Sequence, residues 1–173
     1  AKEADGYVMG DTTSADTTLG PLNSARQRER VEAFLERTPS HADIVTGGKE
    51  PDLPGFFLQP TVVSGLKQDD EMIQREIFGP VITVQPFTDE AEAVRIANDT
   101  PYGLSGSLWT RDCARQLRVA RAMRTGVLGV NSNSSVFPQT PFGGYKQSGV
   151  GKELGMHVLE HNTELKSVFI STE

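Results

Sequence analysis

Apolar residues recur at helical intervals after Ser24, in the first clearly periodic segment of the chain. Ser24 and Gln27 have the spacing of a capping box, in which a serine at the helix start pairs with a residue one turn later. Val31 and Leu35 follow one turn apart, and Pro39 stops the pattern. We therefore predict a helix that begins beside Ser24 and ends before Pro39.

Two further helices are predicted in the second half of the chain. Thr88 is a favourable N-terminal cap for residues 89–98, which place alanine and valine side chains on one side. Residues 112–125 form the next periodic segment. Gly126 is placed to end that helix, because glycine is common just after a helix C-terminus.

Short runs of β-branched and apolar residues alternate with these helices and are typical of strands. The run at residues 81–87 predicts a buried strand, and the glycines between residues 143 and 155 predict a loop that leads into a short helix. The alternation predicts an α/β fold with a largely parallel sheet and helices on its faces. The expected strands cover residues 44–45, 61–63, 81–87, 105–110, 127–131 and 164–170.

The composition is that of an ordinary globular protein of one domain. At 173 residues, with 36% hydrophobic and 23% charged side chains, the chain can bury a sizeable core. With a net charge of −6, the chain lacks the excess of basic residues that attracts nucleic acids and anionic membranes, so we expect neither partner. One cysteine, no apolar run of membrane-span length and no signal-peptide pattern at the start predict a cytoplasmic protein.

The sequence EIFGPV at residues 76–81 carries the first candidate chemistry. In an extended segment Glu76 and Phe78 lie on one face, because side chains alternate along a strand. The carboxylate can accept hydrogen bonds from a diol while the ring packs a flat heterocycle, and a nicotinamide ribose offers both surfaces. The alternative interpretation is a capped turn before a core strand.

The sequence PFGGYKQSGVGKELG at residues 141–155 is the second candidate. Phe142 stands beside two glycines, whose backbone can approach another surface closely, as in the wall of a narrow apolar tunnel. The glycines do not form a dinucleotide-binding fingerprint, since the third arrives one place late and no clear strand precedes them. We expect phosphate binding outside this segment.

Both blocks resemble segments of the NAD(P)-dependent aldehyde dehydrogenases, and further motifs in the same order extend the resemblance over almost the whole chain. The resemblance implies that Glu76 binds the nicotinamide ribose hydroxyls and that Phe78 contacts the nicotinamide ring. It places Phe142 and Phe137 around the aldehyde in its channel. It also gives Glu153 a part in a proton or water relay, with a carboxylate in the first turn of a helix as the alternative.

The resemblance further implies what a parent enzyme would do. It would bind NAD or NADP, attack a small aldehyde with a cysteine thiolate, pass hydride from the thiohemiacetal to the nicotinamide, and hydrolyse the thioester to a carboxylic acid. The family's nucleophilic cysteine, general-base glutamate and Rossmann domain lie upstream of the matching segment, so we expect the isolated chain to be inactive.

The same resemblance predicts how the chain is organised. Residues 1–162 would form the C-terminal part of the catalytic domain. Residues 163–173 would form an oligomerisation strand and tail, because an uncapped strand is suited to edge pairing with another subunit. The parent enzyme would be a homodimer or homotetramer.

Two other features receive structural interpretations. Cys113 lies on the apolar face of a predicted helix and not in the Gly-Gln loop of the family's nucleophile, so we expect a buried thiol. His157 and His161, with Glu160 between them, fit an inverted zinc-protease pattern that also arises by chance. We expect no metal site.

Three classes of function stay open on these grounds. The first is the portion of an oxidoreductase that needs its upstream sequence, the second a non-catalytic oligomerisation module that reuses the fold, and the third, remotely, a zinc hydrolase. Residues 131–139 resemble those of bacterial betaine-aldehyde and aminoaldehyde enzymes, but neither the aldehyde nor the choice between NAD and NADP follows from them.

Overall fold

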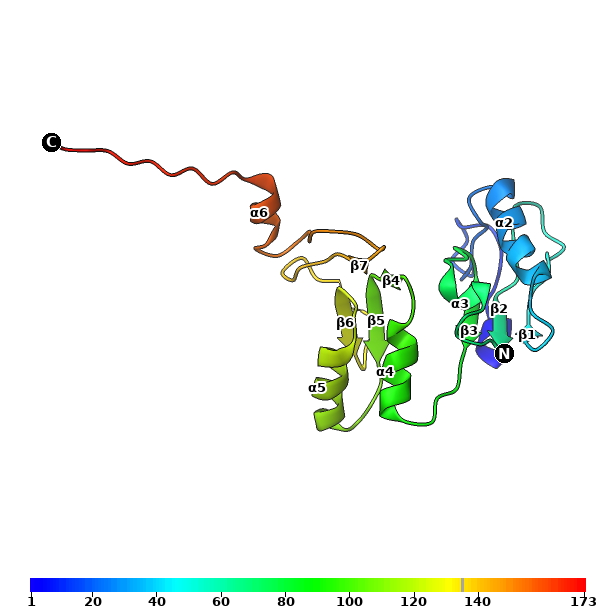
Figure 1. Ribbon diagram of the computed structural model, residues 1–173. Coiled ribbons are helices and arrows are strands. Elements are labelled where there is room, and N and C mark those ends of the chain that lie inside the picture. The colour runs from blue at the N-terminus through cyan, green and yellow to red at the C-terminus, as the bar shows by residue number, and fades with distance from the viewer. Residues whose placement is uncertain (135) are drawn as a thin grey trace. The chain divides into compact units, whose positions relative to one another are not determined.

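The computed structural model describes residues 1–134 and 136–173. The chain divides into two compact units, Ala1–Phe87 and Thr88–Glu173 (Figure 1). The hydrophobic pattern did not indicate this division, because the linking residues carry no run of glycine, proline or charge that would mark a boundary.

The first unit is organised around one long helix. This helix, α2, begins after Ser24, whose Oγ accepts a hydrogen bond from the Gln27 N–H at 3.2 Å, as the capping spacing predicted. It ends before Pro39, also as predicted. The elements of this unit are α1 (Lys2–Asp5), α2 (Ala25–Glu36), β1 (Asp43–Thr46), β2 (Thr61–Ser64), α3 (Glu71–Gln74) and β3 (Val81–Val84).

The core of the first unit forms where α2 packs on the strands. Val31 and Val63 are completely buried, the first on α2 and the second on β2. Ile77, from the segment between α3 and β3, joins the same cluster. The buried members of the cluster are Val31, Phe34, Leu35, Leu58, Val63, Leu66, Met72 and Ile77.

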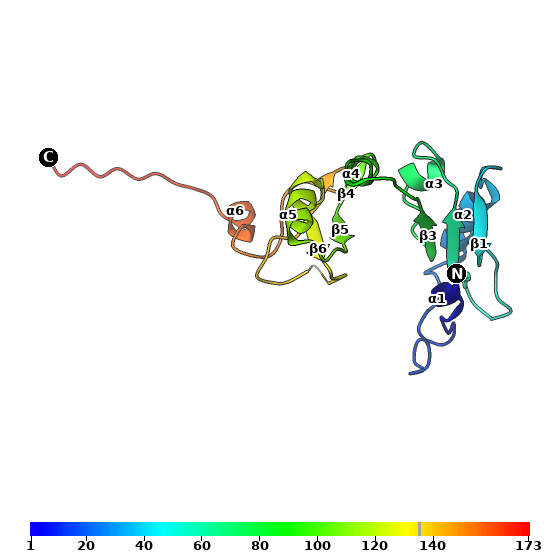
Figure 2. The same cartoon turned by 90° about the horizontal axis from the view of Figure 1, so that it is seen from below.

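The sheet of the first unit has the strand order β1-β2-β3 (Figure 2). β2 pairs antiparallel with β1 and parallel with β3. The predicted burial of residues 81–87 is wrong, because β3 stops at Val84 and leaves Ile82 and Val84 exposed. β3 is an edge strand, and one of its faces is exposed.

The second unit contains one strand–helix–strand motif. β5 and β6 pair in parallel, with α5 between them in sequence, so the predicted alternation is confirmed here. β4 and β7 form a separate antiparallel pair. The elements are α4 (Glu90–Asn98), β4 (Tyr102–Gly103), β5 (Ser105–Leu108), α5 (Cys113–Ala122), β6 (Val127–Val130), β7 (Tyr145–Lys146) and α6 (Val158–Asn162).

The fold is thus mixed α/β, but its sheets differ from the prediction. The described residues form three small sheets that contain both parallel and antiparallel pairs. The expected largely parallel sheet is not formed by them. Alternation of strand and helix indicates parallel pairing only for neighbours joined by a crossover, as β5 and β6 are.

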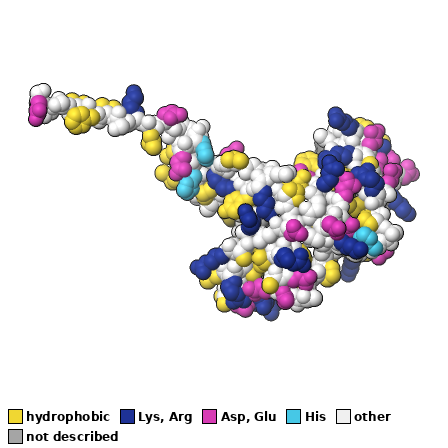
Figure 3. All heavy atoms as spheres, viewed as in Figure 1, with side chains coloured by type: hydrophobic (Ala, Val, Ile, Leu, Met, Phe, Trp, Pro, Cys, Tyr) yellow, Lys and Arg dark blue, Asp and Glu magenta, His cyan; other side chains and the backbone are white. Residues whose placement is uncertain are grey.

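The C-terminal segment also differs from the prediction. Residues 163–173 are exposed and belong to neither a helix nor a strand, so the strand expected at residues 164–170 is not formed. A strand requires a hydrogen-bonding partner, and the segment has none among the described residues. Apolar side chains lie uncovered along it (Figure 3). Among the described helices, none has the length and apolar character needed to span a bilayer.

Candidate functional site

The segment from Glu76 to Phe78 lies on the surface of the first unit, between α3 and β3. Ile77 is 7% exposed and anchors the segment in the core. Glu76 and Phe78 on either side of it are exposed, Phe78 to 67%. One buried residue thus separates two exposed side chains.

The backbone at Phe78 is not extended, contrary to the sequence interpretation. Its φ is 59°, in the left-handed region that bulky residues rarely adopt. The next residue, Gly79, lies against α2. A β-carbon at Gly79 would lie 2.6 Å from Cγ2 of the buried Val31. The chain therefore turns at Phe78 and passes close to the helix at a position that only glycine fits.

Gln27 on α2 holds this turn, and sequence reasoning missed it. Its side-chain Nε2 donates to the carbonyl oxygen of Phe78 at 2.8 Å and to that of Ile77 at 3.4 Å. The only signal in the sequence was the capping-box spacing to Ser24. That spacing predicts a side chain directed back to the helix start, whereas Gln27 reaches a segment about fifty residues away.

A hollow of about 440 Å3 opens beside Phe78. Its wall combines apolar surface with the amide side chains of Asn23 and Gln27, which suits a flat ring that carries polar substituents. Glu76 does not line the hollow, but its exposed carboxylate is two residues away along the chain. The lining residues are Pro21, Leu22, Asn23, Gln27, Phe78 and Gly79.

The glycine-rich block of the second unit folds back on itself. Phe142 and Glu153 exchange two backbone hydrogen bonds of 2.7 Å, so an antiparallel bridge brings these two candidate residues together. Glu153 is exposed and precedes α6, which begins only at Val158, so the alternative placement of its carboxylate in the first turn of a helix is wrong.

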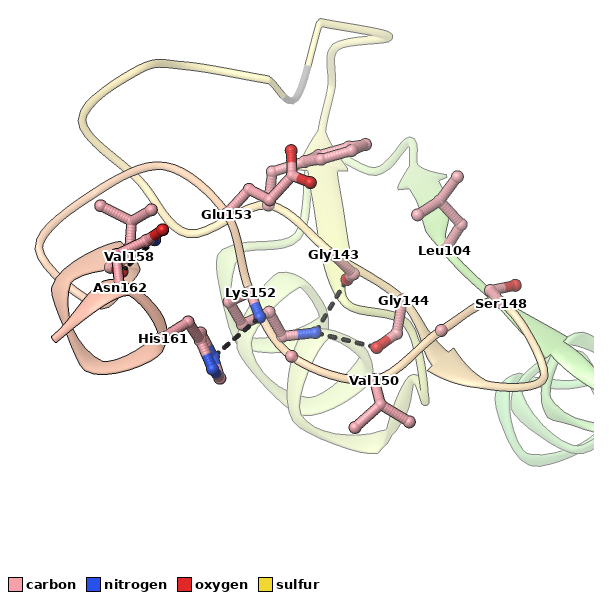
Figure 4. A pocket seen from close by; sticks show the side chains of 13 residues that line it. Leu104, Gly143, Gly144, Ser148, Val150, Lys152, Glu153, Val158, His161 and Asn162 are labelled. Atoms are coloured by element: carbon pink, nitrogen blue, oxygen red, sulfur yellow. Dashed lines mark hydrogen bonds between the residues drawn. The ribbon is translucent and has the colours of Figure 1, made fainter. Parts of the chain in front are cut away.

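Lys152 links the segment around Glu153 to the segment around Phe142. Its Nζ donates to the carbonyl oxygens of Gly143 at 2.8 Å and Gly144 at 3.0 Å (Figure 4). The same ammonium lies 4.8 Å from the centre of the Tyr145 ring. Two of its three N–H donors thus hold the backbone of the two glycines that follow Phe142.

A second hollow, of about 460 Å3, lies over this block. Phe142 and Glu153 both line it, and Figure 4 shows the Glu153 carboxylate on the arm opposite Gly143. Phe137 does not line it. That residue is 51% exposed and starts a turn in which the Thr140 N–H donates to its carbonyl oxygen at 3.0 Å. The second unit thus brings together Phe142 and Glu153 but not Phe137.

The two histidines of the zinc-protease pattern have separate local contacts. His161 Nε2 lies 3.4 Å from the backbone nitrogen of Lys152, which donates to it. His157 Nδ1 lies 3.4 Å from a carboxylate oxygen of Glu160. Across residues 1–134 and 136–173, no group of three His, Cys, Asp or Glu side chains is placed to hold a metal ion.

Cys113 is exposed, so the expectation of a buried thiol is wrong. It is the first residue of α5, where Asp112 caps the helix by accepting a hydrogen bond from the Arg115 N–H at 3.0 Å. The buried residue of α5 is Val119, whereas Leu117 is 61% exposed. The apolar spacing was real, but the helix packs a different face.

Comparisons with known proteins agree with the motifs. Residues 1–168 match the model of the aldehyde dehydrogenase family. Betaine aldehyde dehydrogenase of Bacillus subtilis is 43% identical over 99% of this chain, which covers 36% of that protein. A mitochondrial aldehyde dehydrogenase of Leishmania tarentolae is 38% identical over 99% of the chain and is covered to 34%. The chain therefore spans about a third of the length of the curated relatives it matches.

Solved structures show the same correspondence. Betaine aldehyde dehydrogenase of Staphylococcus aureus in complex with NAD+ matches 92% of this chain with a TM-score of 0.89 and 38% identity, and 33% of that chain is covered. A mutant aldehyde dehydrogenase from Bacillus cereus matches 99% of the chain with a TM-score of 0.95 and 36% identity, and is covered to 35%. On these matches, together with the motifs at residues 76–81 and 141–155, the chain belongs to the aldehyde dehydrogenase family.

Proposed function

We propose that this chain supplies the nicotinamide-side contacts and part of the substrate channel for the NAD(P)-dependent oxidation of a small aldehyde to a carboxylic acid. The observation that carries the proposal is the pair of exposed side chains, Glu76 and Phe78, held on either side of the buried Ile77 next to a hollow. A solved relative binds NAD+, which makes this cofactor the first to test.

The residues present suit the nicotinamide half of the cofactor. The carboxylate of Glu76 can accept hydrogen bonds from two ribose hydroxyls, and the exposed ring of Phe78 can pack a flat heterocycle. When bound, the cofactor would accept hydride from the substrate. The share of this chain would be to bind and orient the ring that receives it.

The second unit would form part of the aldehyde channel. Phe142 lines the hollow of the glycine-rich block, and Phe137 would add to the channel as a second aromatic wall, although it does not line that hollow. Glu153 also lines the hollow, where an exposed carboxylate could pass a proton to or from water. The betaine-aldehyde relatives make a cationic aldehyde the first substrate class to test.

The nucleophile and general base would come from other parts of a complete enzyme. Cys113, the one cysteine, is the exposed first residue of α5, beside the capping Asp112. Among the described residues, no His or Glu side chain is hydrogen-bonded to it. A nucleophile of this kind needs an adjacent base and donors directed at the developing oxyanion. We therefore expect the isolated chain to show no aldehyde-dependent reduction of NAD+ or NADP+, and we expect it to act in the cytoplasm as part of a homo-oligomer.

The cofactor contact can be tested on the 173-residue chain itself. We expect nicotinamide mononucleotide, at millimolar concentration, to shift the backbone amide signals of Phe78 and Gly79 in the NMR spectrum of the 15N-labelled chain. AMP, which carries the other half of NAD, should leave them unchanged. Glu76→Gln is the matched variant, since it keeps the shape of the side chain but removes the charge that favours the ribose hydroxyls.

The result that would count against the proposal is equally direct. If neither nucleotide shifts these signals, or if AMP shifts them as much as nicotinamide mononucleotide does, then the segment is not a nicotinamide site. Equal affinity of Glu76→Gln and the unchanged chain would remove Glu76 from the contact while leaving Phe78 in it.

A further inference from the structure

Phe78 adopts a conformation that its own chemistry disfavours. With φ at 59°, the β-carbon of a bulky residue crowds the neighbouring backbone, and such residues persist only where the surroundings hold them. Asn131, Lys146 and Leu154 also have positive φ. The side chains of Asn131 and Lys146 are hydrogen-bonded to backbone groups, and that of Leu154 is half-buried. The ring of Phe78 is largely exposed, so packing of the ring itself does not explain its conformation.

Two side chains of α2 donate hydrogen bonds to the carbonyl groups of residues 76–78. Gln27 Nε2 donates to the carbonyl oxygens of Phe78 and Ile77, at 2.8 and 3.4 Å. Arg30, almost one turn further along α2, donates through its Nη2 to the carbonyl oxygen of Glu76 at 2.8 Å. Three successive carbonyl groups are thus fixed by one helix, so the directions of the Glu76 and Phe78 side chains are fixed with them.

The helix also supports the segment through packing. Ile77 inserts into the core formed by Val31 and its neighbours, and Gly79 passes so close to Val31 that a β-carbon would overlap its Cγ2. α2 is itself anchored by these buried residues. The support is therefore rigid, which is the condition for holding a binding group in one orientation.

We propose that Gln27 is a positioning residue for the nicotinamide contact: by holding the Phe78 carbonyl it keeps Phe78 left-handed and its ring presented to the hollow. The inference rests on the proposed function, since it gives that site its supporting residue. Gln27 also lines the hollow, but its Nε2 is engaged with the carbonyl oxygens of Ile77 and Phe78, so we assign its effect to the backbone and the ligand contact to Glu76 and Phe78. A site whose competent conformation is only partly populated binds its ligand more weakly by that fraction.

Two substitutions separate this role from a merely structural one. Gln27→Met has similar length and no donor, so it should release the carbonyl groups of Ile77 and Phe78. Gln27→Lys restores a donor of sufficient reach. Glu29→Gln, at an exposed position of the same helix, is the matched control. Each variant is made in the 173-residue chain and titrated with nicotinamide mononucleotide well below its unfolding temperature, where a modest loss of global stability does not alter binding.

We expect Gln27→Met to weaken nicotinamide mononucleotide binding about fivefold, the factor that corresponds to the net contribution of about one neutral hydrogen bond. Gln27→Lys and Glu29→Gln should bind within about twofold of the unchanged chain. The first keeps a donor for the carbonyl groups, and the second changes a residue that does not contact them. The backbone 13C shifts of Phe78, which report its φ, should leave the left-handed range in Gln27→Met alone.

Unchanged binding by Gln27→Met, or a Phe78 that keeps its left-handed shifts in that variant, would overturn the inference. A failure of Gln27→Lys to restore the shifts and the binding would also count against it. If the unchanged chain did not bind nicotinamide mononucleotide, the proposed function and the cofactor role of Gln27 would both be wrong. The shifts of Gln27→Met would still decide whether Gln27 sets the backbone of Phe78.

Discussion

Gly126 has a different role from the one that its place in the sequence predicts. It was expected to end the helix at residues 112–125, but α5 ends at Ala122 and its cap is Met123. A β-carbon at Gly126 would lie 1.6 Å from the carbonyl oxygen of Gly143. The missing side chain therefore allows the backbone before β6 to touch the glycine-rich block that carries Phe142.

Gly126→Ala should destabilise the second unit by about 2 kcal/mol, because the overlapping atom belongs to the backbone and cannot rotate away. The midpoint of urea unfolding, followed by the fluorescence of the single tryptophan, Trp109, would measure this loss. Gly106→Ala is the matched control in β5, since the nearest atoms to its β-carbon are side-chain atoms at 3.4 and 3.5 Å. If both variants unfold at the same urea concentration, the close approach at Gly126 is not required.

At the residue scale, the sequence indicates the side chains at the candidate site but not the residue that holds them. Glu76 and Phe78 stand out because their chemistry and spacing are local properties of one short motif. Gln27 does not, because its contact with Phe78 crosses 51 positions of the chain and depends on how α2 packs. The left-handed turn at Phe78 was missed for the same reason.

At the scale of the elements, the predicted start of α2 is confirmed, but Thr88 is not the cap of α4, whose N-terminal cap is Asp89. Ser24 and Asp112 cap α2 and α5 with hydrogen bonds three residues ahead, so their signal is local. The end of α5 depends on Asn98, whose side-chain amide donates to the Ala122 carbonyl at 2.8 Å and accepts from the Arg124 N–H at 2.7 Å. A cap supplied from α4 leaves no mark in the sequence around residue 122.

Strands were predicted less well than helices, since a strand depends on a partner as much as on its own residues. β-branched and aromatic residues, which favour strands, occur both in β2 and at residues 168–170, yet only β2 has neighbours on both sides. Position in the sheet also decides burial. Val63 of β2 is completely buried, whereas Ile82 of the edge strand β3 is 61% exposed.

An acid-sensitive ion pair joins α4 to α5. Arg118 donates to the Glu90 carboxylate at 2.8 and 2.9 Å, and Arg115 donates at 3.0 Å. These hydrogen bonds, that from Arg118 first, lower the pKa of Glu90 from 4.5 to about 2. Because the folded carboxyl group binds its proton less readily than the unfolded one, the contribution is complete above pH 4.5 and is lost as the pH falls towards 2.

Glu90→Gln should therefore lower the thermal unfolding midpoint at neutral pH, and the difference from the unchanged chain should shrink through this acid range. Circular dichroism melts at a series of pH values would measure the difference. Added salt should reduce it at neutral pH, because the pair is partly exposed. Glu164→Gln, in the exposed C-terminal segment, should show no such trend. A difference that stays constant down to pH about 2 would mean that the ion pair does not link α4 to α5 energetically.

At the scale of the whole molecule, the family could be identified from the sequence more securely than the arrangement of the sheets. The order of the motifs along the chain can be read directly from the sequence, and the family match over residues 1–168 agrees with it. Sheet pairing depends on contacts between distant segments, so the mixed pairing of the three small sheets and the division after Phe87 were not indicated.

The C-terminal segment offers a test of assembly. Leu165, Phe169 and Ile170 are 102%, 91% and 79% exposed, a run of apolar side chains without a partner among the described residues. Exposed β-forming residues of this kind pair readily with the strand edge of a second chain. We expect the 173-residue chain to self-associate through residues 164–173, which would then form the predicted strand.

Deleting residues 164–173 should abolish this association while α6 stays intact, because Thr163 keeps its hydrogen bond to the Leu159 carbonyl at 2.6 Å. Sedimentation velocity over a range of concentrations would compare the full chain with its monomer mass of 18.8 kDa and the shortened chain with its own smaller monomer mass. Phe169→Ser should weaken association because it removes an exposed aromatic ring, whereas Ser167→Ala should not. A full chain that stays monomeric, or a shortened one that associates equally well, would remove the segment from any role in subunit contacts.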